Sequence, residues 1–187
     1  MQLTHYYTAT GKVIDRMANM ERTEIIETFN DPVAQELLRS AIPARLAYVE
    51  TDGTPRVIPI AFYWTGREIV VCTSPTSPKA RALQANPHVA LTIDTEQAPW
   101  TQLLVRGTVA IEVVDGIPPE YLRASEKAMP EEQWEGFAEQ VRGMYPQMAR
   151  ITIVPAWAKV FDFSTGRLPA FLQRLAAERA RREAATG

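Results

Sequence analysis

The chain has 187 residues, of which 46% are hydrophobic and 22% charged, and a formal net charge of -2. These values are typical of one globular domain and exclude wholesale disorder. The near-neutral charge provides no broad basic surface, which argues against nucleic acid as the main partner.

Cys72 is the single cysteine, so no internal disulfide can form, which fits a reducing cytosol. It follows the apolar run 69–71, where a small core residue is a simpler interpretation than a catalytic thiol. Residues 1–22 contain no apolar stretch typical of a signal peptide, and no window reaches the roughly 20 apolar residues of a membrane helix. We therefore expect a soluble, cytoplasmic protein with no membrane partner.

The first forty residues predict an irregular start followed by helix. Residues 1–20 are polar and read as a loose arm or as a segment that packs on a partner. The apolar spacing over 24–40 is roughly helical, but Pro32 interrupts it. Because Asp31-Pro32 resembles a cap followed by proline in a first turn, we expect a short helical turn and then a helix over 32–40.

The middle of the chain is rich in predicted strands. Asp52-Gly53 is a strong hairpin signal, and Pro55 and Pro59 favour an edge strand or a bulge just after it. Short turns then predict a three-stranded antiparallel meander with these strands: 45–51, 54–64 and 68–73.

The second half alternates between both types of element. The expected elements are a helix over 78–84, strands over 88–94 and 102–114, helices over 118–145 divided near Met129-Pro130, a strand region over 150–163, and a helical tail from Pro169. Gly107 is a candidate bulge. Six strands dominated by hairpins predict a mainly β fold with flanking helices, a six-stranded antiparallel split β-barrel. The expected organisation is an arm and helical turn (1–31), a barrel domain (32–168) with a helical insertion (118–146), and a tail (169–187).

The segment 73–81 has the composition of an anion site. Ser77-Pro78 is typical of an N-cap with proline at the first helical position, and a helix N-terminus offers free N–H groups to a phosphate. Lys79 and Arg81 add two cations, and Thr73 adds a hydroxyl. The alternative is a capped surface helix whose cations are merely solvated, since no glycine-rich phosphate loop is present.

Arg56 precedes the apolar run 57–60, where a charge needs a partner because burying it alone is costly. Two partners fit this position: a carboxylate within the fold, or a bound phosphate.

Three stretches, "PRVIPIAFYW", "REIVVCTSPTSPKARALQANPHVALTI" and "TQLLVRGTVAIE", resemble the FMN-binding split barrels of the pyridoxamine 5'-phosphate oxidase-like superfamily, which includes deazaflavin-dependent oxidoreductases. The resemblance covers about residues 32–163. It implies that Arg56 and Lys79 hold the cofactor phosphate, with Ser77 and Arg81 nearby. It also implies the remaining contacts: main-chain atoms around Val57 and Ile58, together with Thr73 and Ser74, beside the ribityl chain and ring, and Gln102 reaching the cofactor from the neighbouring subunit.

The chain departs from the family pattern in two places. Pro78-Lys79 stands where the family has two adjacent basic residues, which removes one cation. The terminal Arg-x-His substrate motif of true pyridoxamine phosphate oxidases is missing, because the two histidines, His5 and His88, lie in other settings. Pyridoxal phosphate synthesis is therefore not expected, and neither histidine has metal-ligand partners at suitable spacing.

The resulting hypothesis is a flavin-dependent oxidoreductase that acts on an unidentified small molecule, as a homodimer with FMN at the subunit interface. In such enzymes the ring carries the hydride chemistry, so a prominent acid–base pair is not required. The deazaflavin coenzyme F-420 is the alternative cofactor, and its longer anionic tail would need a basic groove for which Lys79, Arg81 and Arg45 are candidates. Two further alternatives are a non-catalytic protein that binds a flavin, haem or lipid-like ligand, and a dimeric scaffold with an empty pocket.

Four tryptophans could stack on a flat ring, although a core or interface role is the simpler interpretation for each. They are Trp64, Trp100, Trp134 and Trp157, of which Trp100 and Trp157 are the better placed.

Overall fold

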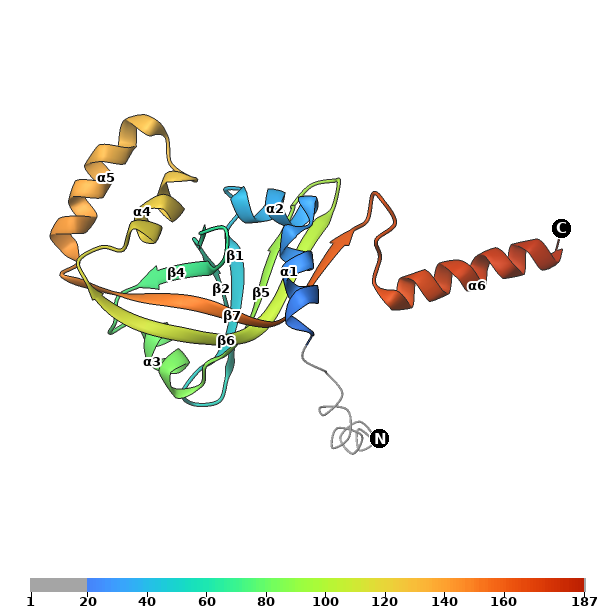
Figure 1. The fold of residues 1–187 in the computed structure, drawn as a ribbon, viewed down its shortest axis with the longest axis horizontal. Coiled ribbons are helices and arrows are strands. Elements are labelled where there is room, and N and C mark those ends of the chain that lie inside the picture. Colours follow the sequence, from blue (N-terminus) through green and yellow to red (C-terminus); the bar gives the residue numbers. More distant parts are fainter. Residues whose placement is uncertain (1–19, 187) are drawn as a thin grey trace, which may run out of the picture.

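The computed structural model describes residues 20–186; the expected arm therefore lies almost wholly outside the described residues, as does His5. Figure 1 shows a curled sheet with helices around it and one helix extending away. The elements within 20–186 are, in order, α1 (Arg22–Asn30), α2 (Pro32–Arg39), β1 (Ala44–Val49), β2 (Pro55–Ile60), β3 (Tyr63–Trp64), β4 (Ile69–Thr73), α3 (Pro78–Ala85), β5 (His88–Asp94), β6 (Thr101–Asp115), α4 (Pro119–Glu126), α5 (Glu131–Met144), β7 (Gln147–Asp162) and α6 (Ala170–Thr186).

The strands form one antiparallel sheet of seven strands, in the order β2-β1-β5-β6-β7-β4-β3. The edge strands β2 and β3 are separated in sequence only by Ala61 and Phe62. Three residue steps span at most about 11 Å. The sheet must therefore curl until its two edges approach each other, which is consistent with a split barrel.

The structure corrects two expectations about the middle of the chain. The expected strand over 54–64 is two strands, because Phe62 turns into the core and is 1% exposed. This break raises the strand number from six to seven. The expected meander is present only in part. β1 pairs with β2, and β3 pairs with β4 across a short turn, as expected, but β2 and β3 lie at opposite edges of the sheet. The other side of β4 pairs with β7, a long-range contact that short turns do not predict.

The β1–β2 hairpin is confirmed. Gly53 adopts a φ of +86°, which favours glycine, and the N–H of Glu50 donates to the Thr54 carbonyl at 2.9 Å. β2 lies at the sheet edge, as its prolines predicted.

The core lies inside the curl and is closed by the N-terminal helices. Asp31 caps α2 by accepting from the N–H of Val33 at 2.9 Å, close to the expected position. Leu37 and Leu38 of α2 are buried, and they join inward-facing residues of the strands, such as Ile151, in one cluster. The expected short turn before α2 is a full helix, α1.

Gly107 marks a bulge between β6 and β7, as expected. The register shifts between Arg106 and Gly107. A Cβ at Gly107 would lie 2.0 Å from the carbonyl oxygen of Val154, so no larger residue fits this close approach.

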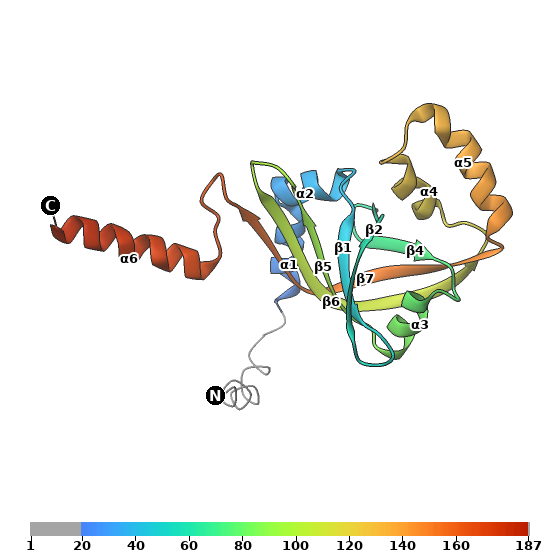
Figure 2. The same cartoon turned by 180° about the vertical axis from the view of Figure 1, so that it is seen from behind.

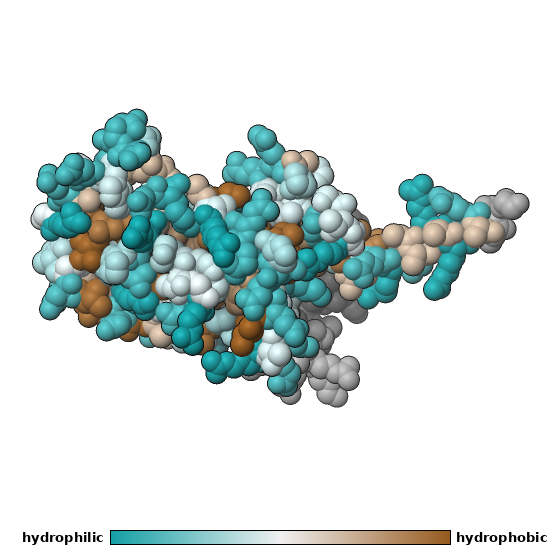
Figure 3. Space-filling view, turned by 45° about the horizontal axis from the view of Figure 1, so that its top comes forward, coloured by the Kyte–Doolittle hydropathy of each residue, from teal (hydrophilic) through white to brown (hydrophobic). Residues whose placement is uncertain are grey.

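The helical insertion and the tail lie at opposite ends of the sheet (Figures 1 and 2). The insertion, α4 and α5, contacts the β4 end, while α6 extends into solvent. Figure 3 shows one face of the molecule as mostly hydrophilic with separate small hydrophobic patches. Within residues 20–186, no helix is both long and apolar enough to cross a bilayer.

Candidate functional site

The start of α3 follows the expected pattern. The Ser77 hydroxyl accepts from the N–H of Ala80 at 3.2 Å, and Pro78 is the first helical residue. β4 ends at Thr73, so its last residue lies beside this helix start. A strand end and a capped helix therefore position the hydroxyls and cations of the segment 73–81 together.

Lys79 is the central residue of this cluster. Its Nζ donates to Thr73 Oγ1 at 3.0 Å, and Thr73 Oγ1 in turn donates to Ser77 Oγ at 3.2 Å. The side chain is half-buried, and this burial lowers the pKa of Lys79. It forms no ion pair with a carboxylate in residues 20–186. A half-buried cation whose partner is a neutral hydroxyl has capacity left for an external anion.

Ser74, in the loop before α3, and Arg81, in the first turn of α3, both contact Thr76. Arg81 Nη1 donates to the Thr76 carbonyl at 3.0 Å, and Ser74 Oγ lies 3.0 Å from Thr76 Oγ1. Arg81 is exposed, so it can add long-range attraction to an anion. The structure thus brings together five of the expected site residues, which we call the Lys79 cluster: Thr73, Ser74, Ser77, Lys79 and Arg81.

Arg56 has a partner within the fold. Its Nε lies 3.2 Å from Glu50 Oε1, which also accepts from the Tyr48 hydroxyl at 3.2 Å. Of the two partners expected for Arg56, the structure therefore contains the carboxylate within the fold. The strand register of the predicted hairpin could have identified Glu50 as this partner. The hairpin places Tyr48 opposite Arg56, and Glu50 follows Tyr48 by two positions, on the same face.

The β1–β2 hairpin and α3 lie at the same end of the molecule (Figures 1 and 2), and α3 packs on β1. Val57 and Ile58 lie on β2 with opposite orientations. Val57 is 64% exposed on the outer face, and Ile58 packs against the core. Because β2 is an edge strand, its backbone is accessible from one side.

Val57 lines a groove of about 740 Å³ across the outer face of the sheet. Arg106 and Trp157 form part of its wall, and the Arg106 guanidinium lies 4.0 Å from the centre of the Trp157 ring. Trp157 is thus stacked by an arginine of its own chain. The other tryptophans differ: Trp64 stacks on Phe29, Trp134 packs near Phe137, and Trp100 is exposed.

Gln102 is not part of the Lys79 cluster within one chain. It pairs with Phe161 near the start of β6, whereas Val113, near the end of β6, pairs with Ala149, the partner of Thr73. The two positions lie at opposite ends of the longest strand pair. Arg45 lies near the start of β1, at the end away from the β1–β2 hairpin, and its guanidinium forms an ion pair with Asp94.

The surroundings of Cys72 and His88 do not indicate a catalytic role for either residue. Burial, with a smaller effect from Glu120, raises the pKa of the Cys72 thiol to about 12, so the nucleophilic thiolate is scarce near neutral pH. His88 Nδ1 lies 3.0 Å from Asn86 Oδ1. In the part of the chain that the structure describes, no group of three or more His, Cys, Asp or Glu side chains is arranged to hold a metal.

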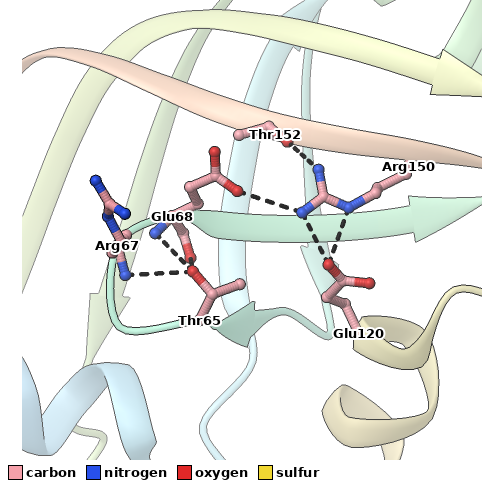
Figure 4. Close-up of polar contacts among 6 residues, drawn as sticks. All are labelled: Thr65, Arg67, Glu68, Glu120, Arg150 and Thr152. Carbon is pink, nitrogen blue, oxygen red and sulfur yellow. Dashed lines mark hydrogen bonds and ion pairs between the residues drawn. The ribbon is translucent and has the colours of Figure 1, made fainter.

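A second polar cluster, which the sequence analysis missed, joins the insertion to the sheet (Figure 4). Arg150 of β7 donates to Glu120 of α4 through Nε at 2.9 Å and Nη2 at 2.8 Å. Nη2 also contacts Glu68 at 3.3 Å, and Nη1 donates to Thr152 at 2.8 Å. The Glu120 side chain is 14% exposed, so this ion pair is largely desolvated. Arg150 is 30 residues from Glu120 and 82 residues from Glu68 in the sequence, so no local pattern predicts these contacts.

Lys127, at the end of α4, is a second half-buried lysine. Its Nζ lies 4.1 Å from the centre of the Phe62 ring and 3.5 Å from the Leu38 carbonyl oxygen. Burial lowers the pKa of Lys127 to about 8. A carbonyl at the C-terminus of α2 and an aromatic face are partners for a cation, so this lysine holds the insertion to the body of the protein.

Comparison with solved structures supports the fold. An F-420 reductase is 26% identical, with a TM-score of 0.53 over 67% of this chain and 94% of its own. A conserved hypothetical protein from Mycobacterium tuberculosis is 18% identical, with a TM-score of 0.52 over 80% of this chain and 89% of its own. General Stress Protein 26 from Bacillus anthracis is 17% identical, with a TM-score of 0.50 over 71% of this chain and 93% of its own. A search of curated proteins gave no match.

A model of one protein family, described as pyridoxamine 5'-phosphate oxidase, matches residues 31–152. The match includes β1 to β6, α3 and the Lys79 cluster, and it extends over more than half of the chain. The protein therefore belongs to the pyridoxamine 5'-phosphate oxidase family.

Proposed function

We propose that this protein is a flavin-dependent oxidoreductase that binds FMN through the Lys79 cluster and acts on a small molecule. The observation that carries the proposal is the half-buried Lys79, which has a hydroxyl partner and no carboxylate partner in residues 20–186. Ordinary structural lysines are solvated or paired. A lysine held beside a capped helix start is suited to a phosphate.

The residues present fit a flavin phosphate. At the start of α3, Pro78 has no N–H, and those of Ala80 and Arg81 already donate to Ser77. The Lys79 N–H and ammonium would therefore donate to the phosphate oxygens, with Thr73 and Ser77 completing the hydrogen bonds. Arg81 would supply long-range attraction. Arg56 would contribute to the same phosphate only by sharing its guanidinium with Glu50, since Nε is already engaged.

The rest of the site would position the ring and keep water away from it. β2 presents an accessible edge backbone around Val57 and Ile58, and backbone N–H and C=O groups are suited to flavin heteroatoms. When bound, the flavin supplies hydride transfer, which none of these side chains can perform. The chain's own contribution is therefore binding, orientation and local charge.

We also propose a homodimer in which the second subunit completes the site. Gln102 lies at the far end of β6 from Thr73, so it would reach a cofactor at the Lys79 cluster from the partner rather than from its own chain. The outer sheet groove with the exposed Val57 provides an apolar surface for this contact.

Coenzyme F-420 is the second candidate cofactor, because the solved structure that is 26% identical is an F-420 reductase. Arg81 is exposed beside the Lys79 cluster, so its charge would be available to a longer anionic tail. Arg45 is not available for that tail, since Asp94 and Glu96 pair with it.

The test is a parallel titration of the purified full-length protein with FMN and with coenzyme F-420, followed by absorbance. Changing Lys79→Gln should weaken binding of the preferred cofactor about 10- to 100-fold, as expected for a charge-assisted hydrogen bond of about 1.5–3 kcal/mol. The matched control is Arg142→Gln, an exposed arginine on α5 outside the proposed site and dimer surface, which should bind as the wild type does. If Lys79→Gln binds FMN and F-420 as tightly as the wild type, the site is wrong.

Turnover is tested separately. The cofactor-loaded protein should be reduced anaerobically by NADPH or NADH, or reoxidised by an added acceptor, faster than the free cofactor. A tightly bound cofactor that is neither reduced nor reoxidised faster than the free one would support the non-catalytic binding function instead.

A further inference from the structure

A second groove lies away from the Lys79 cluster, where β4 is too short to cover β7. β4 pairs with β7 only as far as Ile153, and beyond this point α1 and the β3–β4 turn flank the bulged part of β7. The groove has a volume of about 670 Å³, within the range of small-molecule sites. It shares no residue with the Lys79 cluster.

The walls of this groove are apolar. Phe29 of α1 stacks on Trp64 with ring centres 5.4 Å apart, and both rings line the groove. Ile26 and Val154 line it from opposite elements and are 50% and 47% exposed. Exposed aliphatic side chains in a concave site favour a ligand that removes their surface from water.

Two arginines line the same groove. Arg22 is the first residue of α1, and Arg67 lies in the β3–β4 turn. Figure 4 shows the Arg67 side chain directed away from Arg150. Neither groove arginine forms an ion pair with a carboxylate in residues 20–186, whereas Arg150 and Arg167 do. The groove thus combines an apolar interior with two available cations.

We propose that this groove binds a small amphipathic carboxylate, an aliphatic or aromatic acid with one anionic end. The hydrocarbon part would lie between Ile26, Val154 and the Phe29–Trp64 pair, and the carboxylate would contact Arg22 and Arg67. The charge of the two arginines selects an anion over a neutral or cationic amphiphile of the same length.

The experiment is isothermal titration of the full-length protein with decanoate, decanol and decyltrimethylammonium, below their aggregation concentrations. Decanoate should bind most tightly. Arg22→Gln and Arg67→Gln should each weaken decanoate about three- to fivefold, as expected for partly exposed ion pairs, and should leave decanol unchanged. Ile26→Asp should abolish decanoate binding while the thermal unfolding midpoint stays near that of the wild type.

Arg142→Gln is the matched control, since Arg142 is an exposed arginine on α5 outside the groove and should leave decanoate binding unchanged. Equal binding of decanoate and decanol, unaffected by either groove arginine, would overturn the proposal, and so would the absence of decanoate binding. If Ile26→Asp instead dissociates a dimer that never binds decanoate, the groove is a contact between copies and the proposal fails. FMN affinity should be the same in the Arg22 and Arg67 variants, so failure here is distinguishable from failure of the proposed function.

Discussion

Lys79 and Arg150 lie near the same strand, β4, yet their surroundings differ. Arg150 contacts two carboxylates and a hydroxyl, whereas Lys79 contacts one hydroxyl. Both side chains are partly removed from water. The charge of Arg150 is neutralised inside the protein and holds two elements together. The charge of Lys79 has no carboxylate partner in residues 20–186, so it is suited to bind an external anion.

The largest expected change in stability comes from replacing Arg150. Arg150→Met leaves Glu120 largely buried without its counter-ion, so the free energy of unfolding should fall by about 2–3 kcal/mol. Urea denaturation of the apo-protein measures this change. Glu68→Gln is the control, because that side chain is 47% exposed and its loss should cost about 0.5 kcal/mol. A loss below about 1 kcal/mol for Arg150→Met would mean that the network does not hold the insertion.

Lys79 should behave in the opposite way. Lys79→Gln removes a partly desolvated charge and no ion pair, so the free energy of unfolding of the apo-protein should stay within about 0.5 kcal/mol of the wild type, or rise. The same urea experiment measures it. A loss comparable to that of Arg150→Met would assign Lys79 a structural role and remove the contrast between the two cations.

Lys127, a third partly buried cation, should make the free energy of unfolding depend on pH. Its pKa of about 8 in the folded protein lies below the ordinary value of 10.5, so between these values the unfolded chain binds more protons than the folded one. The free energy of unfolding of the wild type should therefore rise relative to Lys127→Met as the pH increases from about 8 to about 10.5. Denaturation of both proteins across this range tests the sign, and a difference that falls with pH would contradict the burial of Lys127.

The smallest effect is expected at Cys72, which lies on β4 opposite Arg150. With a thiol pKa of about 12, iodoacetamide at pH 8 should modify Cys72 much more slowly than a free cysteine. Cys72→Ala should leave FMN affinity within about twofold of the wild type. Rapid alkylation accompanied by loss of cofactor would place the thiol in the site.

Local patterns predicted the elements whose causes are local. Ser77-Pro78 predicted α3, Asp52-Gly53 predicted the first hairpin, and Gly107 predicted the bulge, because caps, turns and close approaches depend on a few neighbouring residues. For the same reason the sequence could identify the Lys79 cluster, whose members lie within nine positions of one another.

The errors have non-local causes. Nothing near Phe62 indicates that its side chain enters the core and ends β2, which raises the strand number. The pairing of β4 with β7 joins segments far apart in the sequence, so no local turn predicts it. Arg150 and Glu120 meet only because the insertion folds back over β4. Gln102 is a different case, because its role depends on a second subunit and stays a prediction.

The two-residue connection between β2 and β3 limits how far apart two portions of the proposed cofactor site can move. β2 carries Arg56 and Val57, and β4, which pairs with β3, ends at Thr73 beside Lys79. Lengthening the chain at Ala61–Phe62 would let the opposite sheet edges drift apart, and the proposed phosphate and ring contacts would lose their fixed spacing. The spacing of these proposed contacts is therefore set by covalent chain length as well as by packing, which makes this short connection a natural place to alter cofactor preference by insertion.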